Sequence, residues 1–206
     1  MPATGCSVRV KMDGLAQYKA KFIELLEATG REGVPELLYW LETTDFYTAP
    51  ASTRYHGSYE GGLLEHSVLT CKALRRLIRA FELDIPPQSA DIVSLLHDVC
   101  KTGFYKLSKR NVKNSDGKWE EVPCYTIEDA FPYGHGEKSV LLLSGHIRLT
   151  DEEAIAIRWH MGAYDDAAQS YSGAGTLGRA LSQYPLASAL HIADMIESHL
   201  LNTKQL

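Results

Sequence analysis

The stretch Leu95-Leu96-His97-Asp98-Val99-Cys100-Lys101 sets an adjacent histidine and aspartate, followed by a lysine, inside a short apolar run. On a helix, Lys101 lies three residues after Asp98 and four after His97, so the three side chains share one side of a turn. A carboxylate beside an imidazole in apolar surroundings is costly to desolvate unless a cation or a hydrogen-bond network compensates it. The stretch therefore predicts that other parts of the chain supply partners.

The composition is that of an ordinary globular protein with room for one sizeable core, so we expect residues 1–206 to form a single domain. The net charge of -5 disfavours non-specific binding to long nucleic acid, which needs a basic face. Because no apolar run has membrane-spanning length and no signal-peptide core is visible, we expect a cytoplasmic protein without membrane contact. Cys6, Cys71, Cys100 and Cys124 lack zinc-knuckle spacing and are expected to be free thiols.

Hydrophobic periodicity predicts an all-α bundle that is interrupted by one β-hairpin. After a loose tail at residues 1–12, two N-terminal helices are expected within 13–50 and the bundle core within 55–201. From about 104 to 127 the residues alternate around the turn signal Asn114-Ser115-Asp116-Gly117, so this segment is predicted to form the hairpin. Helices are expected at about 15–29, 35–41, 63–81, 92–98, 134–144, 151–162 (with Thr150 and Glu153 as a capping box) and 184–201, and a loop at 163–179.

Histidines and aspartates recur among the apolar residues of several predicted helices. Taken singly, each histidine is explained as a hydrogen-bonded core residue, whereas Asp194 on an inner face needs a cation nearby. Together they indicate a metal site, because bundles build such sites from imidazole and carboxylate ligands on facing helices. The candidate ligands are His66, His97, Asp98, His135, His160 and Asp194.

The ordered series of these residues resembles the HD superfamily of metal-dependent phosphohydrolases, from about Tyr55 to Glu197. Three segments are similar to the HD module of bacterial 3′→5′ exonucleases and of related stand-alone phosphohydrolases. They are Glu60-Gly61-Gly62-Leu63-Leu64-Glu65-His66-Ser67, Leu96-His97-Asp98 and His191-Ile192-Ala193-Asp194. The resemblance implies an HD-domain helical bundle and a hydrolase that acts on phosphoric ester bonds.

The resemblance also implies a role for each ligand. His66, His97, Asp98 and Asp194 would hold a first divalent metal ion, and Asp98 would bridge to a second ion completed by His135 and His160. One departure is Met161, which stands where several two-metal members have a second consecutive histidine, and a thioether is a poor ligand for a hard ion. One or two ions are therefore expected, and mixed imidazole and carboxylate ligation favours Mn, Fe or Co over Zn or Mg.

Two ions that share a carboxylate can activate a water for in-line attack on phosphorus, which makes Asp98 a catalytic residue. Lys101 is expected to offset charge on a phosphate oxygen or to orient the nucleophile, and the alternative is a surface lysine in a salt bridge. The resemblance places His56 near the substrate, although a loop residue that caps a helix explains it equally well. Lys109 and Arg110, in the basic hairpin, belong either to a lid over a phosphorylated substrate or to a strand edge protected from pairing.

The expected function is hydrolysis of a phosphate ester or phosphodiester of a nucleotide or similar small substrate. A 3′→5′ exonuclease on short single-stranded nucleic acid is an alternative, and so is a di-iron oxygenase of HD fold. A non-catalytic ligand sensor is a further class, against which the intact ligand set argues. A homo-oligomer stays open, because the apolar faces of the first two helices suit packing either on the bundle or on a second copy.

Overall fold

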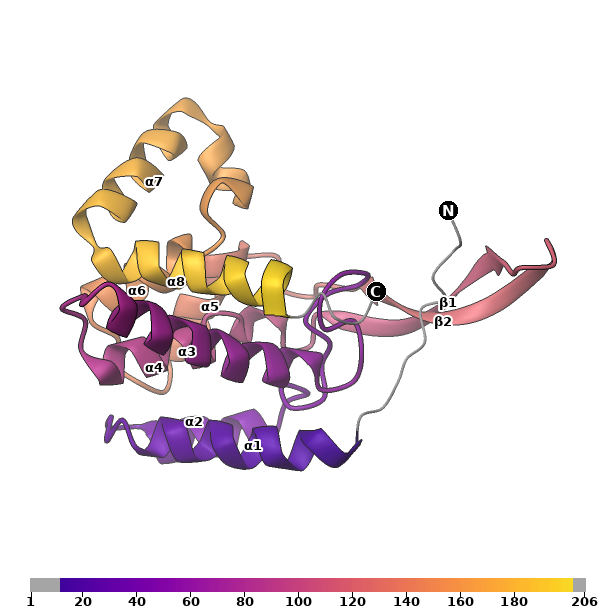
Figure 1. Cartoon of the computed structure of the whole chain (residues 1–206), viewed down its shortest axis with the longest axis horizontal. Helices are drawn as coiled ribbons and strands as arrows, with labels where there is room; N and C mark the ends of the chain where they lie inside the picture. Colours follow the sequence, from indigo (N-terminus) through magenta and orange to yellow (C-terminus); the bar gives the residue numbers. More distant parts are fainter. Residues whose placement is uncertain (1–11, 202–206) are drawn as a thin grey trace.

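The computed structural model describes residues 12–201 as a helical body from which a two-stranded hairpin extends (Figure 1). The predicted mostly helical fold with a hairpin at about 104–127 is confirmed. The predicted tail and Cys6 lie outside the described residues, except that residue 12 already belongs to the first helix. The elements are α1 (Met12–Glu27), α2 (Val34–Glu42), α3 (Gly62–Ala80), α4 (Pro87–Leu96), β1 (Tyr105–Lys113), β2 (Trp119–Ile127), α5 (His135–Ser144), α6 (Asp151–Trp159), α7 (Tyr171–Gln183) and α8 (Pro185–Ile196).

The core lies where α3, α4, α6 and α8 pack against one another. Leu64, Leu96 and Leu190 are fully buried there, and each contributes about 1.5–3 kcal/mol through removal of its side chain from water. α1 and α2 cover one side of the bundle (Figure 1) and add the buried side chains of Phe22 and Leu37 to the same core. The N-terminal helices therefore pack on the bundle, which is one of the two arrangements predicted for them. Among residues 12–201, no helix is both long and apolar enough to cross a bilayer.

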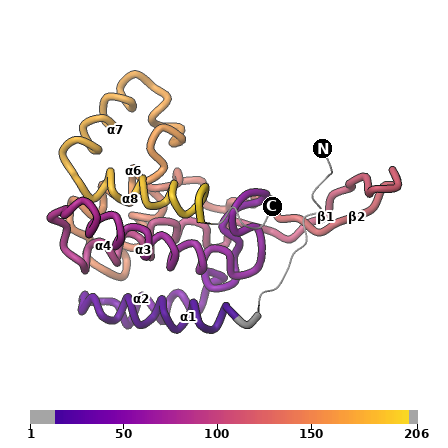
Figure 2. Tube along the Cα trace, viewed as in Figure 1, coloured from indigo at the N-terminus to yellow at the C-terminus, as the bar shows by residue number. Residues whose placement is uncertain are grey.

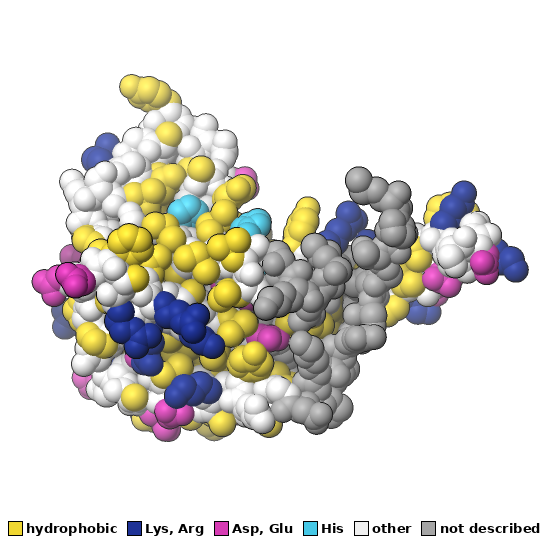
Figure 3. Space-filling view, viewed as in Figure 1, with side chains coloured by type: hydrophobic (Ala, Val, Ile, Leu, Met, Phe, Trp, Pro, Cys, Tyr) yellow, Lys and Arg dark blue, Asp and Glu magenta, His cyan; other side chains and the backbone are white. Residues whose placement is uncertain are grey.

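The hairpin has the predicted turn. β1 and β2 pair antiparallel along their full length, and Asn114 Oδ1 accepts hydrogen bonds of 3.0 Å from the backbone N–H groups of Asp116 and Lys118. Gly117 takes a φ of 75°, a conformation that favours glycine. Figure 2 shows the hairpin leading away from the helices, and Figure 3 shows basic and acidic side chains together at its outer end.

The prediction of a loop at 163–179 is wrong, because α7 occupies most of this segment. Ser170 Oγ caps the helix by accepting a 3.0 Å hydrogen bond from the N–H of Gly173. Leu177 and Ala180 form a small buried cluster with Trp159 and Ala168. The glycines of this segment lower its intrinsic helix propensity, and burial of this apolar stripe stabilises the helix in spite of them.

Two ligand-bearing segments begin where a helix ends. α4 ends at Leu96 rather than continuing through Asp98, and α6 ends at Trp159 rather than near Gly162. His97 and His160 follow these helices directly and still have helical backbone angles, with φ and ψ of -55° and -33° at His97. After His97 the chain tightens into the 3₁₀ turn Val99–Lys101, a common ending for an α-helix.

Glu153 fixes the start of α6 from a fully buried position. Its N–H donates to Thr150 Oγ1 at 3.2 Å and its carboxylate accepts from the N–H of Thr150 at 2.8 Å, so the predicted capping box is confirmed. The same carboxylate accepts two hydrogen bonds from the Arg31 guanidinium, at 2.6 and 2.9 Å. Glu153 thereby joins the segment between α1 and α2 to α6.

Gly136, in the first turn of α5, allows that helix to approach α6 closely. A Cβ at this position would lie 2.2 Å from the backbone oxygen of Arg158. Gly136→Ala is therefore expected to destabilise the protein by about 1–3 kcal/mol through overpacking, measured by chemical denaturation. In the matched control Gly178→Ala, the added Cβ meets nothing within 4 Å, so a gain of about 0.5–1 kcal/mol is expected from helix propensity alone. Equal stability of the two variants would contradict the close approach of α5 and α6.

Candidate metal centre

All six predicted metal ligands meet in one cluster. α3 carries His66, the turn after α4 carries His97 and Asp98, α5 opens with His135, His160 follows α6, and α8 carries Asp194. Each of them has a nitrogen or oxygen within 3.5 Å of an atom of another member. His66, His97, Asp98 and His160 are at most 2% exposed, so the packing of the surrounding helices holds them in place. The cluster is therefore a buried polar centre within an apolar core.

The carboxylate of Asp98 lies between two sets of imidazoles. Its Oδ2 is 3.4 Å from His66 Nε2 and 3.5 Å from His97 Nε2. Its Oδ1 is 2.9 Å from His135 Nε2 and 3.5 Å from His160 Nε2. Each oxygen of one side chain thus faces its own pair of histidines, which is the arrangement of a bridging ligand.

Backbone carbonyls set the orientation of two of these rings. His97 Nδ1 lies 3.0 Å from the carbonyl oxygen of Ser94, and His160 Nδ1 lies 2.7 Å from that of Ile157. A carbonyl oxygen only accepts, so each Nδ1 carries the proton and each Nε2 points its lone pair into the cluster. His160 Nε2 is buried and has no hydrogen-bond partner among the described residues. A buried lone pair without a donor is what a cation would satisfy.

The donor set fits a divalent ion. Three groups each bring three ligand atoms within 4.8 Å of one another: His66, His97 and Asp98; His97, His160 and Asp194; and Asp98, His135 and His160. Imidazole nitrogens and carboxylate oxygens are ordinary ligands of first-row divalent metals. These buried groups could therefore hold a metal ion, and Asp98 belongs to two of the three.

The charge of Asp98 is compensated by a nearby ammonium group. Lys101 Nζ lies 2.6 Å from Asp98 Oδ2, and its side chain is only 12% exposed. Burial by itself would raise the pKa of Asp98, but the Lys101 ammonium and the hydrogen bond from His135 outweigh burial and hold that pKa well below its usual range. Burial also disfavours a charged His66, yet Glu197 and the other carboxylates raise its pKa to about 10. Burial lowers the pKa of His97 to about 3, so this ring stays neutral.

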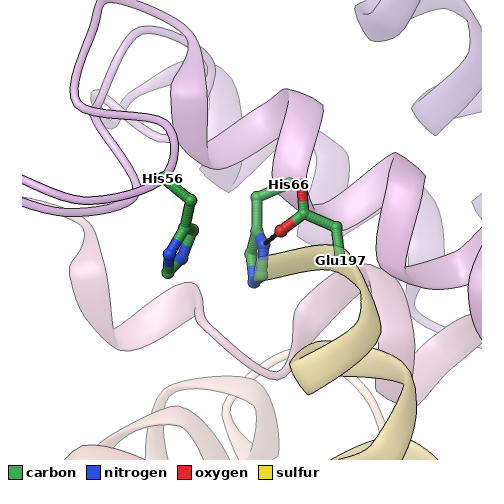
Figure 4. Close-up of side chains that lie close together, drawn as sticks. All are labelled: His56, His66 and Glu197. Carbon is green, nitrogen blue, oxygen red and sulfur yellow. Dashed lines mark hydrogen bonds and ion pairs between the residues drawn. The ribbon is translucent and has the colours of Figure 1, made fainter. Parts of the chain in front are cut away.

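Glu197 and Cys100 contact the predicted ligands and were not predicted from the sequence as part of the site. Glu197 is fully buried and its carboxylate bonds His66 Nδ1 (Figure 4). Cys100 Sγ lies 3.3 Å from His135 Nδ1. The position of Glu197, three residues after Asp194 and so on the same side of a helix, is the signal that could have identified it.

The residues predicted to bind substrate lie in different places. Lys101 is in a salt bridge but is not on the surface, since it reaches the centre of the cluster. His56 lies beside His66, with the two rings 5.2 Å apart (Figure 4). Its Nε2 is 3.3 Å from Ser198 Oγ.

Lys109 and Arg110 lie on the hairpin that leads away from the helices (Figure 1). Lys109 Nζ is exposed and 3.0 Å from Glu121 Oε2 across the hairpin, an arrangement that suits a protected strand edge. The structure does not bring these two residues into the cluster, and their role in substrate binding stays a prediction.

No family model, no curated protein and no solved structure matches this chain.

Proposed function

We propose that this chain is an HD-type metal-dependent phosphohydrolase, which cleaves a phosphate ester or phosphodiester of a nucleotide or similar small substrate. The observation that carries the proposal is the placement of Asp98, with each carboxylate oxygen facing a different pair of histidines. When bound, divalent ions supply stabilisation of phosphoryl oxygens and lower the pKa of water. Four imidazole nitrogens within 3.5 Å of one carboxylate support this role.

The residues divide into two ligand sets under this proposal. The first set is His66, His97, Asp98 and Asp194, and the second is Asp98, His135 and His160. Lys101 Nζ donates a hydrogen bond to Asp98, the carboxylate that the two sets share. The ammonium would therefore lie close to an anionic phosphoryl group bound by the metal ions. It can balance the charge of such a group.

Metal content followed by a phosphate-release assay tests the proposal. We expect the purified protein to contain a divalent ion. In the presence of Mn²⁺ it should release phosphate or a nucleotide from some members of a panel of phosphate esters and nucleotides. Chelation should abolish the activity and Mn²⁺ should restore it. A short labelled oligonucleotide in the same panel distinguishes an exonuclease, which would release mononucleotides from its 3′ end.

Two outcomes contradict the proposal. Oxygen consumption that depends on Fe, without any phosphate release, would assign the centre to oxygenase chemistry. A protein that takes up no Mn²⁺, Fe²⁺ or Co²⁺ would leave the cluster as a buried hydrogen-bond network.

A further inference from the structure

Glu197 supports one ligand of the metal centre from outside it. It is the first residue of a π-helical turn, Glu197–Leu201, that continues α8, and its side chain is fully buried. Figure 4 shows its carboxylate reaching the ring of His66 from the end of α8, and a hydrogen bond joins it to Nδ1 of that ring. The carboxylate thus fixes a ring that belongs to a helix far away in the sequence.

This contact determines which nitrogen of His66 is free to bind a metal. A carboxylate holds the proton on Nδ1, so a metal that binds this ring would do so through Nε2 and would displace any proton held there. His66 Nε2 lies 3.1 Å from His97 Nε2 and 3.4 Å from both Asp98 Oδ2 and Asp194 Oδ1. The ring is therefore held with its ligand atom at the centre.

The acceptor behind His66 differs from those behind the other rings. His97 and His160 donate to backbone carbonyl oxygens, whereas the partner of His66 is the carboxylate of Glu197. A hydrogen bond to an ionised acceptor is roughly twice as strong as one between neutral groups. A carboxylate behind an imidazole also makes the ring a more basic ligand.

The π-helical turn supports a second ligand in the same way. Ser198 Oγ lies 3.3 Å from Asp194 Oδ1 and 3.3 Å from His56 Nε2. Two consecutive residues of the turn thus contact two ligands on different helices. Single π-helical turns occur frequently at functional sites, where they reposition side chains relative to a regular helix.

We propose that Glu197 is a positioning residue that acts through His66 to strengthen metal binding. The inference rests on the proposed function only in requiring that the cluster binds a metal. His56, His66 and Glu197 also lie close enough to hold an ion by themselves. The geometry favours positioning, because an ion held between His66 Nδ1 and Glu197 would have to replace the hydrogen bond that joins them.

Mn²⁺ titration of the metal-free full chain tests the inference, with Glu197→Gln compared to Glu65→Gln. Glu65 is a matched control because it neighbours His66 on α3 and accepts hydrogen bonds from Tyr18 at 2.9 Å and Tyr59 at 2.5 Å, not from a ligand. We expect Glu197→Gln to weaken Mn²⁺ binding by about 10- to 100-fold. Glu65→Gln should bind as the wild type does.

A double-mutant cycle separates positioning from a general structural role. In a His66→Ala background, Glu197→Gln should cause no further loss of Mn²⁺ affinity, because its effect passes through the missing ring. If the losses of Mn²⁺ affinity in the two single variants add up in the double variant, the inference is overturned. It is also overturned if Glu197→Gln binds one Mn²⁺ ion fewer than the wild type and binds any remaining ion with unchanged affinity. Failure of the wild type to bind Mn²⁺ would overturn the proposed function as well, whereas wild-type binding with an unaffected Glu197→Gln variant would overturn this inference alone.

A measurement on the wild type decides the question even where the variant does not fold. In protein labelled with ¹⁵N-histidine and titrated with Zn²⁺ as a diamagnetic ion, His66 should keep its proton on Nδ1 while Nε2 takes the metal-bound shift. A metal-bound Nδ1 would overturn the inference.

Discussion

Asp98→Asn should lower phosphate release by about 1000-fold and remove most of the bound metal. The substitution keeps the shape of the side chain but replaces an anionic carboxylate, which both histidine pairs face, with a neutral amide. Loss of metal assistance is expected to cost about 4 kcal/mol of transition-state stabilisation. This free energy corresponds to a rate about 1000-fold lower. Metal content by atomic spectroscopy and the phosphate assay measure the two effects separately.

Asp91→Asn is the control for Asp98→Asn. Asp91 is also a buried carboxylate, on α4, and it accepts a 2.6 Å hydrogen bond from Arg75 Nε, but it contacts no member of the cluster. Both variants leave a cation without its carboxylate, Lys101 in one and Arg75 in the other, so both are expected to lose stability. Only Asp98→Asn should also lose metal. An Asp98→Asn protein that keeps its metal and its activity contradicts the proposed function.

Arg31→Met should lower the free energy of unfolding by about 3–5 kcal/mol at pH 7, because it leaves the fully buried carboxylate of Glu153 without its cation. Lys19→Met is the control, since it removes a partner of Glu42 from an exposed pair with 35% and 49% of the side chains accessible. An exposed pair is worth about 0–1 kcal/mol. Urea denaturation measures both variants, and equal losses would contradict a special role for the Arg31 pair.

The pH dependence of this pair has a definite sign. Burial by itself would raise the pKa of Glu153, but the hydrogen bonds from Arg31 and Thr150 outweigh burial and lower it. A carboxyl group with a lowered folded-state pKa stabilises the protein above its unfolded-state pKa, near 4.5, and loses this contribution as the pH falls through the lowered value. The wild type and Arg31→Met should therefore differ most at neutral pH and least in acid, where Glu153 is protonated in both.

The periodic parts of this fold could be predicted from the sequence. Apolar residues at helical spacing predicted the helices around the core, and alternation around the turn signal Asn114-Ser115-Asp116-Gly117 predicted the hairpin. The segment that became α7 could not be predicted, because its glycines hide a narrow apolar stripe that is stabilised by tertiary contacts with Trp159 and Ala168. Helix propensity is a local quantity, and here tertiary burial overrides it.

The metal cluster could be predicted in part. The residue types and their order identified all six members of the buried cluster, because imidazoles and carboxylates on inner faces are rare without a common cause. The spacing of Glu197 from Asp194 places both residues on one side of a helix, but the ring that Glu197 contacts could not be predicted. The acceptor for His66 Nδ1 depends on how the end of α8 packs against α3. The burial of Lys101 likewise depends on the 3₁₀ turn Val99–Lys101, which the spacing of apolar residues in the sequence does not indicate.

The ligands of the centre are drawn from segments that span most of the chain, from α3 to α8. An ion bound by them would act as a crosslink between distant parts of the polypeptide, and the unfolded chain does not preserve such a site. Loading and folding would then form one linked equilibrium, with the melting temperature rising as the concentration of free ion rises. The ambient supply of metal would thereby set how long each molecule persists before it unfolds, in addition to setting how fast it turns over.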